Sequence, residues 1–142
     1  MILTHGIPKS TIVTGETYED VLRMKFLPAL RVKQPKKAAA MFFHHDNTTP
    51  HRAARVHQFF DNNFEVVPHA PYSPDLAPGD FGLFPTLKDT LHGCTFSSCS
   101  TLVTVIFQWS QRTPKEAFAA AMQSWHQRCE KCVRLWGDYV EK

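Results

Sequence analysis

Two aspartates, Asp46 and Asp80, lie in surroundings where carboxylates commonly bind metal ions. Asp46 follows an apolar run over residues 38–43, which is typical of a buried strand and places the carboxylate at the strand's carboxyl end. Asp80 follows a proline-rich stretch and precedes an apolar segment, which predicts a capping carboxylate at a helix start. Mg²⁺ and Mn²⁺ prefer such oxygen ligands. The pair therefore predicts a divalent-metal site for phosphate chemistry.

The segments before Asp46 predict a helix, a basic loop and a strand. Apolar residues at helical spacing predict a helix over residues 15–30, with its last turn disturbed by Pro28. The basic loop 31–37 contains Lys36 and Lys37, and it is either a solvated connection or a phosphate contact or import signal. Residues 38–45 are apolar without alternation, which favours a strand covered on both faces. Residues 2–4 resemble the tail of another strand.

The segments after Asp46 alternate between helix and strand and then become helical. We expect a helix over residues 51–62, a strand over 64–67 and a helix after Asp80 that is distorted near Pro85. The β-branched segment 102–109 leaves strand possible, but helix is preferred. A capping box at 113–116 predicts the start of a long helix. The whole pattern predicts an α/β fold with a helical C-terminal part.

Several polar and aromatic residues have two possible roles, one functional and one structural. The spacing of the histidines 44, 45, 51 and 69 fits no usual zinc pattern, which favours hydrogen bonding around the aspartates. Cysteines 94, 99, 129 and 132 suggest a zinc knuckle, but the last two fall in a predicted helix, which favours free thiols. The tryptophans at 109, 125 and 136 suit base stacking or, at helical spacing, the core.

Bulk composition excludes few functions. The 142 residues have room for one domain with a sizeable core, and a net charge of +3 does not by itself indicate nucleic acid. No stretch approaches the roughly 20 apolar residues of a membrane span. The first residues do not resemble a signal peptide, so a reducing compartment and free thiols are expected.

Three motifs together resemble the catalytic domain of mariner-type transposases of the DDE/D superfamily. They are HDNTTPH at 45–51, PHAPYSPDLAPGD at 68–80 and WHQRCEKCVRLWGDY at 125–139. The resemblance covers nearly all of residues 1–142, as the C-terminal part of such a domain without its N-terminal helix-turn-helix domain. It implies an RNase H-like fold that is incomplete, with the first two strands of the sheet missing and residues 38–45 exposed at an edge. Residues 2–4 are a candidate replacement neighbour for that edge.

The resemblance also implies an activity and partners. The family cleaves and joins DNA strands with two metal ions held by three carboxylates, among which Asp46 matches the second and Asp80 the third. The first would precede this chain, which predicts that the chain by itself is inactive and leaves its status as an enzyme open. The 33 residues between the two aspartates, 47–79, are one fewer than in the mariner pattern, a difference expected at Asn62-Asn63.

Transposon-end DNA, a homodimer or a partner transposase, and a nuclear location follow as expectations from the same resemblance. Lys36, Lys37, His51 and Arg52 are the predicted DNA contacts, and Mg²⁺ or Mn²⁺ is the predicted cofactor. Two alternatives remain at this stage. The chain is a non-catalytic module that binds nucleic acid or a transposase, or it is a decayed transposon relic.

Overall fold

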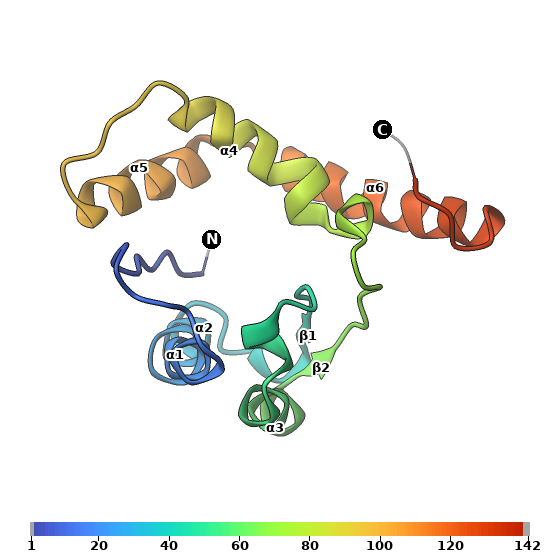
Figure 1. Ribbon diagram of the computed structural model, residues 1–142, viewed down its shortest axis with the longest axis horizontal. Helices are drawn as coiled ribbons and strands as arrows, with labels where there is room; N and C mark the ends of the chain where they lie inside the picture. The colour runs from blue at the N-terminus through green and yellow to red at the C-terminus, as the bar shows by residue number, and fades with distance from the viewer. Residues whose placement is uncertain (1, 141–142) are drawn as a thin grey trace. The chain divides into compact units, whose positions relative to one another are not determined.

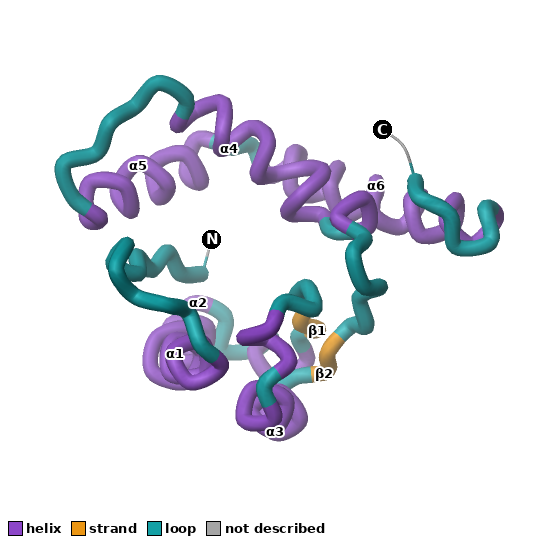
Figure 2. Tube along the Cα trace, viewed as in Figure 1, coloured by secondary structure: helices purple, strands orange, loops and turns teal. Residues whose placement is uncertain are grey.

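The chain divides into two compact units. A computed structural model describes residues 2–140, and its contacts separate an N-terminal unit, residues 1–69, from a C-terminal unit, residues 70–142. Each unit is described by itself, with the elements labelled in Figure 1 and coloured by type in Figure 2.

The N-terminal unit begins with one long helix that changes its winding in the middle. It comprises α1 (Gly15–Val21), a π-helical turn η1 (Leu22–Phe26) and α2 (Leu27–Lys33). Thr14 caps α1 by accepting the Thr17 N–H at 3.2 Å. The predicted helix is confirmed, but the disturbance precedes Pro28 and does not end the helix. Proline has no N–H and its ring crowds the preceding turn, so a wider turn accommodates it.

The sheet of this unit is much smaller than the sequence predicts. Among the described residues it consists of β1 (Phe42–Phe43) and β2 (Glu65–Val66), which pair in parallel with Phe42 opposite Glu65. The predicted strand 38–45 is confirmed only at Phe42–Phe43, because Ala38–Ala40 forms a 3₁₀ turn, η2, and residues 44 and 45 lie outside the strand. In that turn the Ala38 N–H bonds back to the Gln34 carbonyl at 3.0 Å and is not available for a ladder. Residues 2–4 form no strand, so the proposed replacement neighbour is also wrong.

A helix connects the two strands. The chain leaves β1, makes a 3₁₀ turn η3 (Thr49–Arg52) and then forms α3 (Ala54–Asn63), which leads into β2. The predicted helix therefore starts later than residue 51, because Pro50 opens a tighter turn first. The result is one βαβ unit, whose strands and helix are seen beside one another in Figure 1. Because the two strands are parallel, they end at the same edge of the sheet. The residues that follow β1 and those that follow β2 therefore lie close together.

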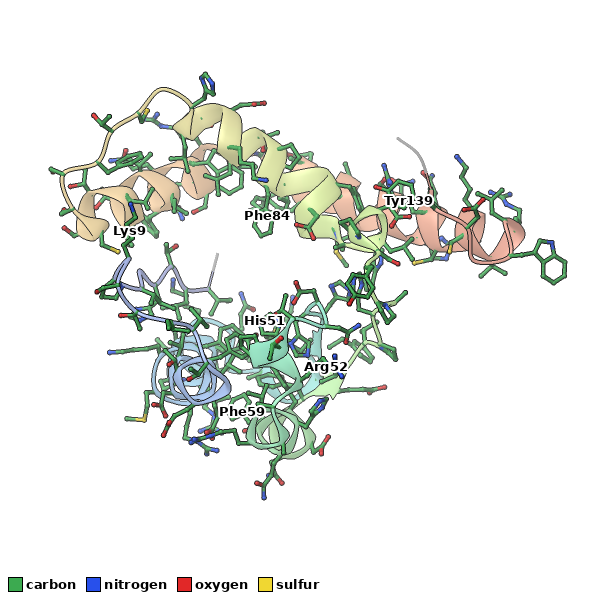
Figure 3. The ribbon with its side chains drawn as sticks, in the orientation of Figure 1. Lys9, His51, Arg52, Phe59, Phe84 and Tyr139 are labelled. Carbon is green, nitrogen blue, oxygen red and sulfur yellow. The ribbon has the colours of Figure 1, made fainter. Side chains whose placement is uncertain are left out.

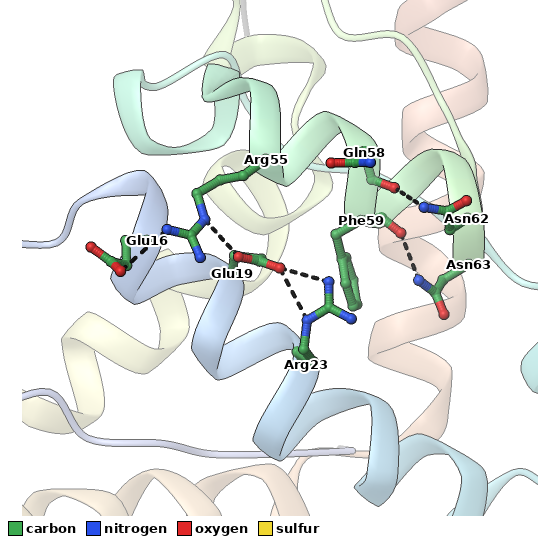
Figure 4. A network of polar contacts seen from close by, with 8 residues as sticks. All are labelled: Glu16, Glu19, Arg23, Arg55, Gln58, Phe59, Asn62 and Asn63. Atoms are coloured by element: carbon green, nitrogen blue, oxygen red, sulfur yellow. Dashed lines mark hydrogen bonds and ion pairs between the residues drawn. The ribbon is translucent and has the colours of Figure 1, made fainter.

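The core of the N-terminal unit lies between α1, η1 and α3. Leu22, Val56, Phe59 and Phe60 are buried there, and Phe60 is 2% exposed. A carboxylate is buried beside this core: Glu19 is 6% exposed. It accepts hydrogen bonds from Arg23 Nη2 and from Arg55 Nε, both at 2.6 Å, and Arg55 also reaches Glu16 at 3.3 Å (Figure 4). The bonds from Arg23 and then Arg55 hold the pKa of Glu19 below its ordinary value.

Replacing Glu19 by glutamine is expected to lower the midpoint of thermal unfolding of the full chain by more than about 5 °C. The change removes the charge that satisfies two guanidinium groups at the contact of α1 with α3. Glu16→Gln is the matched control, because Glu16 shares Arg55 but its side chain is 71% exposed. We expect the control to change stability by less than about 0.5 kcal/mol. Equal unfolding midpoints for the two variants, measured by circular dichroism, would show that the buried Glu19 carboxylate does not stabilise the contact of α1 with α3.

The C-terminal unit is helical in its described part. It contains a 3₁₀ turn η4 (Pro74–Leu76), a π-helical turn η5 (Gly79–Leu83), α4 (Phe84–Leu91), α5 (Cys99–Arg112) and α6 (Lys115–Arg134). The preference for helix over residues 102–109 is confirmed, with Ser98 capping α5. The capping box at 113–116 is wrong, because Pro114 is the cap residue and the Thr113 hydroxyl donates to the Trp109 carbonyl at 2.8 Å.

The three tryptophans have different environments. Trp109 and Trp125 are half-buried, which agrees with a packing role. Trp136 is 97% exposed in a left-handed conformation with φ of 58°, so its predicted place in the core is wrong. It follows the last turn of α6, where the chain reverses and a side chain points away from the helix. None of the helices in residues 2–140 combines the length and the apolar character needed to cross a membrane.

Candidate functional site

Asp46 occupies the predicted position after β1. Its Oδ1 accepts hydrogen bonds from the Thr48 N–H at 3.2 Å and the Thr48 hydroxyl at 2.9 Å, the pattern of an Asx turn. His51 Nδ1 lies 2.6 Å from the same oxygen. The structure records no hydrogen bond to Oδ2 among the described residues, and the side chain is 45% exposed. The local turn thus orients the carboxylate with one oxygen open.

The surroundings of Asp46 favour its ionised form. Partial burial alone would raise the pKa of Asp46, but the two bonds from Thr48 and the nearby His51 outweigh it and hold that pKa below its ordinary value. The carboxylate is therefore charged at neutral pH. A charged oxygen donor is what a divalent cation requires.

A cluster of rings lies behind this carboxylate. The Tyr18 and His51 ring centroids are 4.2 Å apart, and those of His45 and His51 are 4.9 Å apart. Burial lowers the pKa of His45 to about 4, and its Nδ1 has no hydrogen-bond partner. Burial and then the charge of Asp46 raise the pKa of Tyr18 to about 12. His45 and Tyr18 are thus neutral at neutral pH, whereas Asp46 is charged.

The stability of the N-terminal unit is expected to fall by about 1 kcal/mol between pH 6.5 and pH 5 because of His45. Its pKa is about 4 in the folded chain, against the ordinary 6.5, so in this window the unfolded chain binds the proton better. Stability is complete above pH 6.5 and is lost as the pH falls toward 4. The full pKa shift of His45 would correspond to a larger loss of stability, but solvent screening reduces the effect for a half-buried ring.

Urea unfolding followed by circular dichroism, with EDTA present, measures this pH dependence. His45→Gln is expected to flatten the curve between pH 6.5 and pH 5. His92→Gln is the control, since His92 is exposed in the C-terminal unit and is not among the groups that shift the pKa of His45. A His45→Gln curve as steep as that of the wild type would show that other groups cause the loss.

Asp80 lies in the C-terminal unit and differs from its prediction. Pro78 occupies the cap position of η5 and Asp80 is already inside the helical turn, so the predicted capping role is wrong. The helical geometry starts early because the N–H groups of Asp80 and Phe81 both donate to the Ala77 carbonyl, at 2.9 and 3.1 Å. The Asp80 side chain is exposed, and it makes no hydrogen bond or ion pair within the described part of the chain.

The predicted DNA-contacting residues all belong to the N-terminal unit. Arg52 is exposed and extends from η3 next to His51 (Figure 3). Lys36 and Lys37 are exposed in the turn that follows α2. His51 is half-buried and turned toward Asp46, so its first role is to hold that carboxylate. A second histidine pair lies nearby, with His44 Nε2 3.1 Å from His69 Nδ1.

Sequence reasoning missed two residues of the site. Thr48 was detectable, because a threonine two positions after an aspartate is a common Asx-turn pair. Tyr18 was not detectable, because at helical spacing on α1 it is indistinguishable from an ordinary core residue.

The cysteines are free thiols, and burial raises the pKa of Cys129, so that thiol is protonated at neutral pH.

Comparison with known proteins finds two related sequences, although no family model matches the chain. The Mariner Mos1 transposase of Drosophila mauritiana is 35% identical over 117 residues, which are 80% of this chain and 34% of that protein. The human histone-lysine N-methyltransferase SETMAR is 31% identical over 98 residues, 68% of this chain and 14% of that protein. The chain therefore spans about a third of the length of the fly transposase.

Solved structures give the same relationship over the whole fold. The crystal structure of the catalytic domain of Mos1 mariner transposase superposes with a TM-score of 0.89 and 30% identity, over 99% of this chain and 70% of that one. The structure of that domain with raltegravir and Mg superposes with a TM-score of 0.84 and 32% identity, over 93% of this chain and 67% of that one. An incomplete RNase H-like fold is confirmed, and residues 2–140 contain two strands and a helical remainder. The chain belongs to the mariner transposase family and corresponds to part of its catalytic domain.

Proposed function

We propose that this chain is a transposase-derived domain whose Asp46 and Asp80 bind a divalent metal ion, Mg²⁺ or Mn²⁺, for cleavage and transfer of DNA strands. The observation that carries the proposal is the carboxylate of Asp46, which Thr48 and His51 orient at the end of β1 with one oxygen open. Mos1 catalytic domain structures with Mg and with Mn support the choice of metals.

The residues present fit such an ion in kind. Asp46 is an ionised oxygen donor with an open Oδ2, and Asp80 is an exposed carboxylate with no hydrogen bond or ion pair to the described residues. Hard divalent cations select oxygen donors of this type. Among the described residues, no group of three or more His, Cys, Asp or Glu side chains is placed to hold a metal. Asp46 belongs to the N-terminal unit and Asp80 to the C-terminal unit.

The chain's own residues have distinct parts in this proposal. Asp46 and Asp80 bind the ion, and Thr48 and His51 fix the direction of the Asp46 oxygens. A bound divalent ion would supply Lewis-acid stabilisation and lower the pKa of a coordinated water. The family pattern uses three carboxylates, and this chain offers two. If the missing ligand raises the barrier by about 4 kcal/mol, the rate falls roughly 1000-fold, so we expect no measurable cleavage by these 142 residues alone.

The partners proposed for the chain are transposon-end DNA and a transposase, either a second copy or a relative, acting in the nucleus. Mos1 transposase forms a paired-end complex with a left transposon end and a strand transfer complex, which supports DNA as the partner class. Arg52, Lys36 and Lys37 are the proposed backbone contacts because they are exposed and positively charged. His51 is proposed to contribute from the same turn as Arg52.

Titration calorimetry with Mn²⁺ and Mg²⁺ tests the metal site. We expect the wild type to bind Mn²⁺ weakly, with a dissociation constant on the order of 10⁻⁴–10⁻³ M, and Asp46→Ala and Asp80→Ala each to weaken binding more than about tenfold. Asp61→Ala and Asp89→Ala are matched controls, since both are exposed aspartates on helices α3 and α4.

Equal binding by all four variants would refute the site and leave a non-catalytic module that binds nucleic acid or a transposase. Loss of binding in the two site variants alone would support the metal site. Nuclease assays on transposon-end DNA would then compare the chain with an intact relative.

A further inference from the structure

Arg128, on α6, connects three separate segments of the C-terminal unit. Its Nη1 donates to the Asp75 carbonyl at 3.1 Å and to the Val140 carbonyl at 3.4 Å. Its guanidinium also lies over the Phe81 ring, 4.2 Å from the centroid. One side chain thus links η4, η5 and the C-terminal segment to a single helix. A planar guanidinium can donate in its plane and stack on a ring face at once, which a lysine ammonium cannot do.

The buried side chain of Asp75 adds a second link between η4 and the C-terminal segment. It is 5% exposed, and its Oδ2 accepts the Val140 N–H at 2.8 Å, while its Oδ1 has no hydrogen-bond partner. Val140 is 2% exposed and is held at both its N–H and its carbonyl. Asp75 is thus linked to Arg128 through its backbone carbonyl and to Val140 through its side chain. The C-terminal segment and η4 are therefore fixed together by this pair.

The same helix holds η5, the turn that contains Asp80. A Cβ built on Gly82 would lie 3.0 Å from the Ala121 Cβ, so this turn packs closely against α6. Ala121 and Arg128 are seven residues apart, two turns along one face of the helix. Phe81 and Gly82 contact that face, whereas Asp80 is exposed. The two residues that follow Asp80 are thus both held against α6, which restricts the backbone of the turn that presents the exposed carboxylate.

We propose that Arg128 is a positioning residue for the Asp80 carboxylate, acting through the Phe81 ring and the backbone of Asp75. The inference rests on the proposed function, because it takes Asp80 to be a metal ligand. A ligand on a fixed turn binds an ion more tightly than one on a mobile turn, since less ordering is needed on binding. Arg128 itself does not touch the metal.

Mn²⁺ broadening of the Asp80 and Phe81 amide signals in NMR spectra of the full chain tests the inference. We expect Arg128→Lys and Phe81→Leu each to weaken Mn²⁺ binding about three- to tenfold, and the double variant to bind no more weakly than the weaker single one. Such non-additivity marks residues that act through one contact. Arg134→Lys is the control, because Arg134 is exposed at the end of α6, and it should bind as the wild type does.

The outcomes separate positioning from simple stabilisation. A purely structural role would lower the unfolding midpoint of Arg128→Lys and leave Mn²⁺ affinity below the transition unchanged, which would overturn the inference. In that case loss of binding in Asp80→Ala would still support the proposed function. A wild type without Mn²⁺ broadening at Asp80 would overturn both.

Discussion

Replacing Phe60 by alanine is expected to lower the free energy of unfolding of the N-terminal unit by about 3–5 kcal/mol. Phe60 is 2% exposed, and its ring contacts those of Phe43 and His45, with centroids 4.6 and 4.8 Å away. The change removes a buried ring of α3 that contacts β1, and it leaves a cavity. Since His45 precedes Asp46, the loss also loosens the strand end that presents the carboxylate.

The control for Phe60→Ala is Phe42→Ala. Phe42 belongs to β1 itself but is 64% exposed, so its loss is expected to cost less than about 1 kcal/mol. All three tryptophans lie in the C-terminal unit, so tryptophan fluorescence would not report on this change. Urea titrations followed through the NMR signals of residues 2–69 would report on the stability of the N-terminal unit. Similar losses for the two variants would show that Phe60 is not the centre of this core.

Replacing Gly15 by alanine is expected to destabilise the N-terminal unit by about 1–3 kcal/mol through overpacking. A Cβ built on Gly15 would overlap the Ala53 Cβ, so the backbone would have to shift to accommodate it. Gly15 begins α1 and Ala53 precedes α3, so the two helices start in direct contact. A shift there would also displace η3, which carries His51.

The double variant Gly15→Ala with Ala53→Gly distinguishes crowding from other effects of the substitution. It keeps one Cβ at the contact, so we expect most of the lost stability to return. The coupling free energy from a double-mutant cycle should be at least about 1 kcal/mol. Additive effects of the two changes would show that the close approach is not what requires a glycine.

Local patterns predicted much of this protein. Periodicity gave the helices over residues 15–33, 54–63, 99–112 and 115–134 within a few residues of their bounds, because an amphipathic spacing is a property of neighbouring residues. The family motifs identified the mariner relationship, which the comparisons confirm. The position of Asp46 after a strand was also predictable, since the end of an apolar run marks it. The details of capping at Asp80 and Thr113 were not, because a proline nearby moved each helix start.

The sequence by itself therefore determined the family, the order of helices and strands, and the two candidate carboxylates. Tertiary structure decided which side chains surround them. The contacts of Tyr18 with His51, of Glu19 with Arg55 and of Arg128 with Phe81 all join residues that are far apart in the chain. Tertiary structure also limited the sheet to two short strands and left Trp136 exposed. The physical reason is that burial and partner choice depend on how elements pack, and no local spacing encodes that packing.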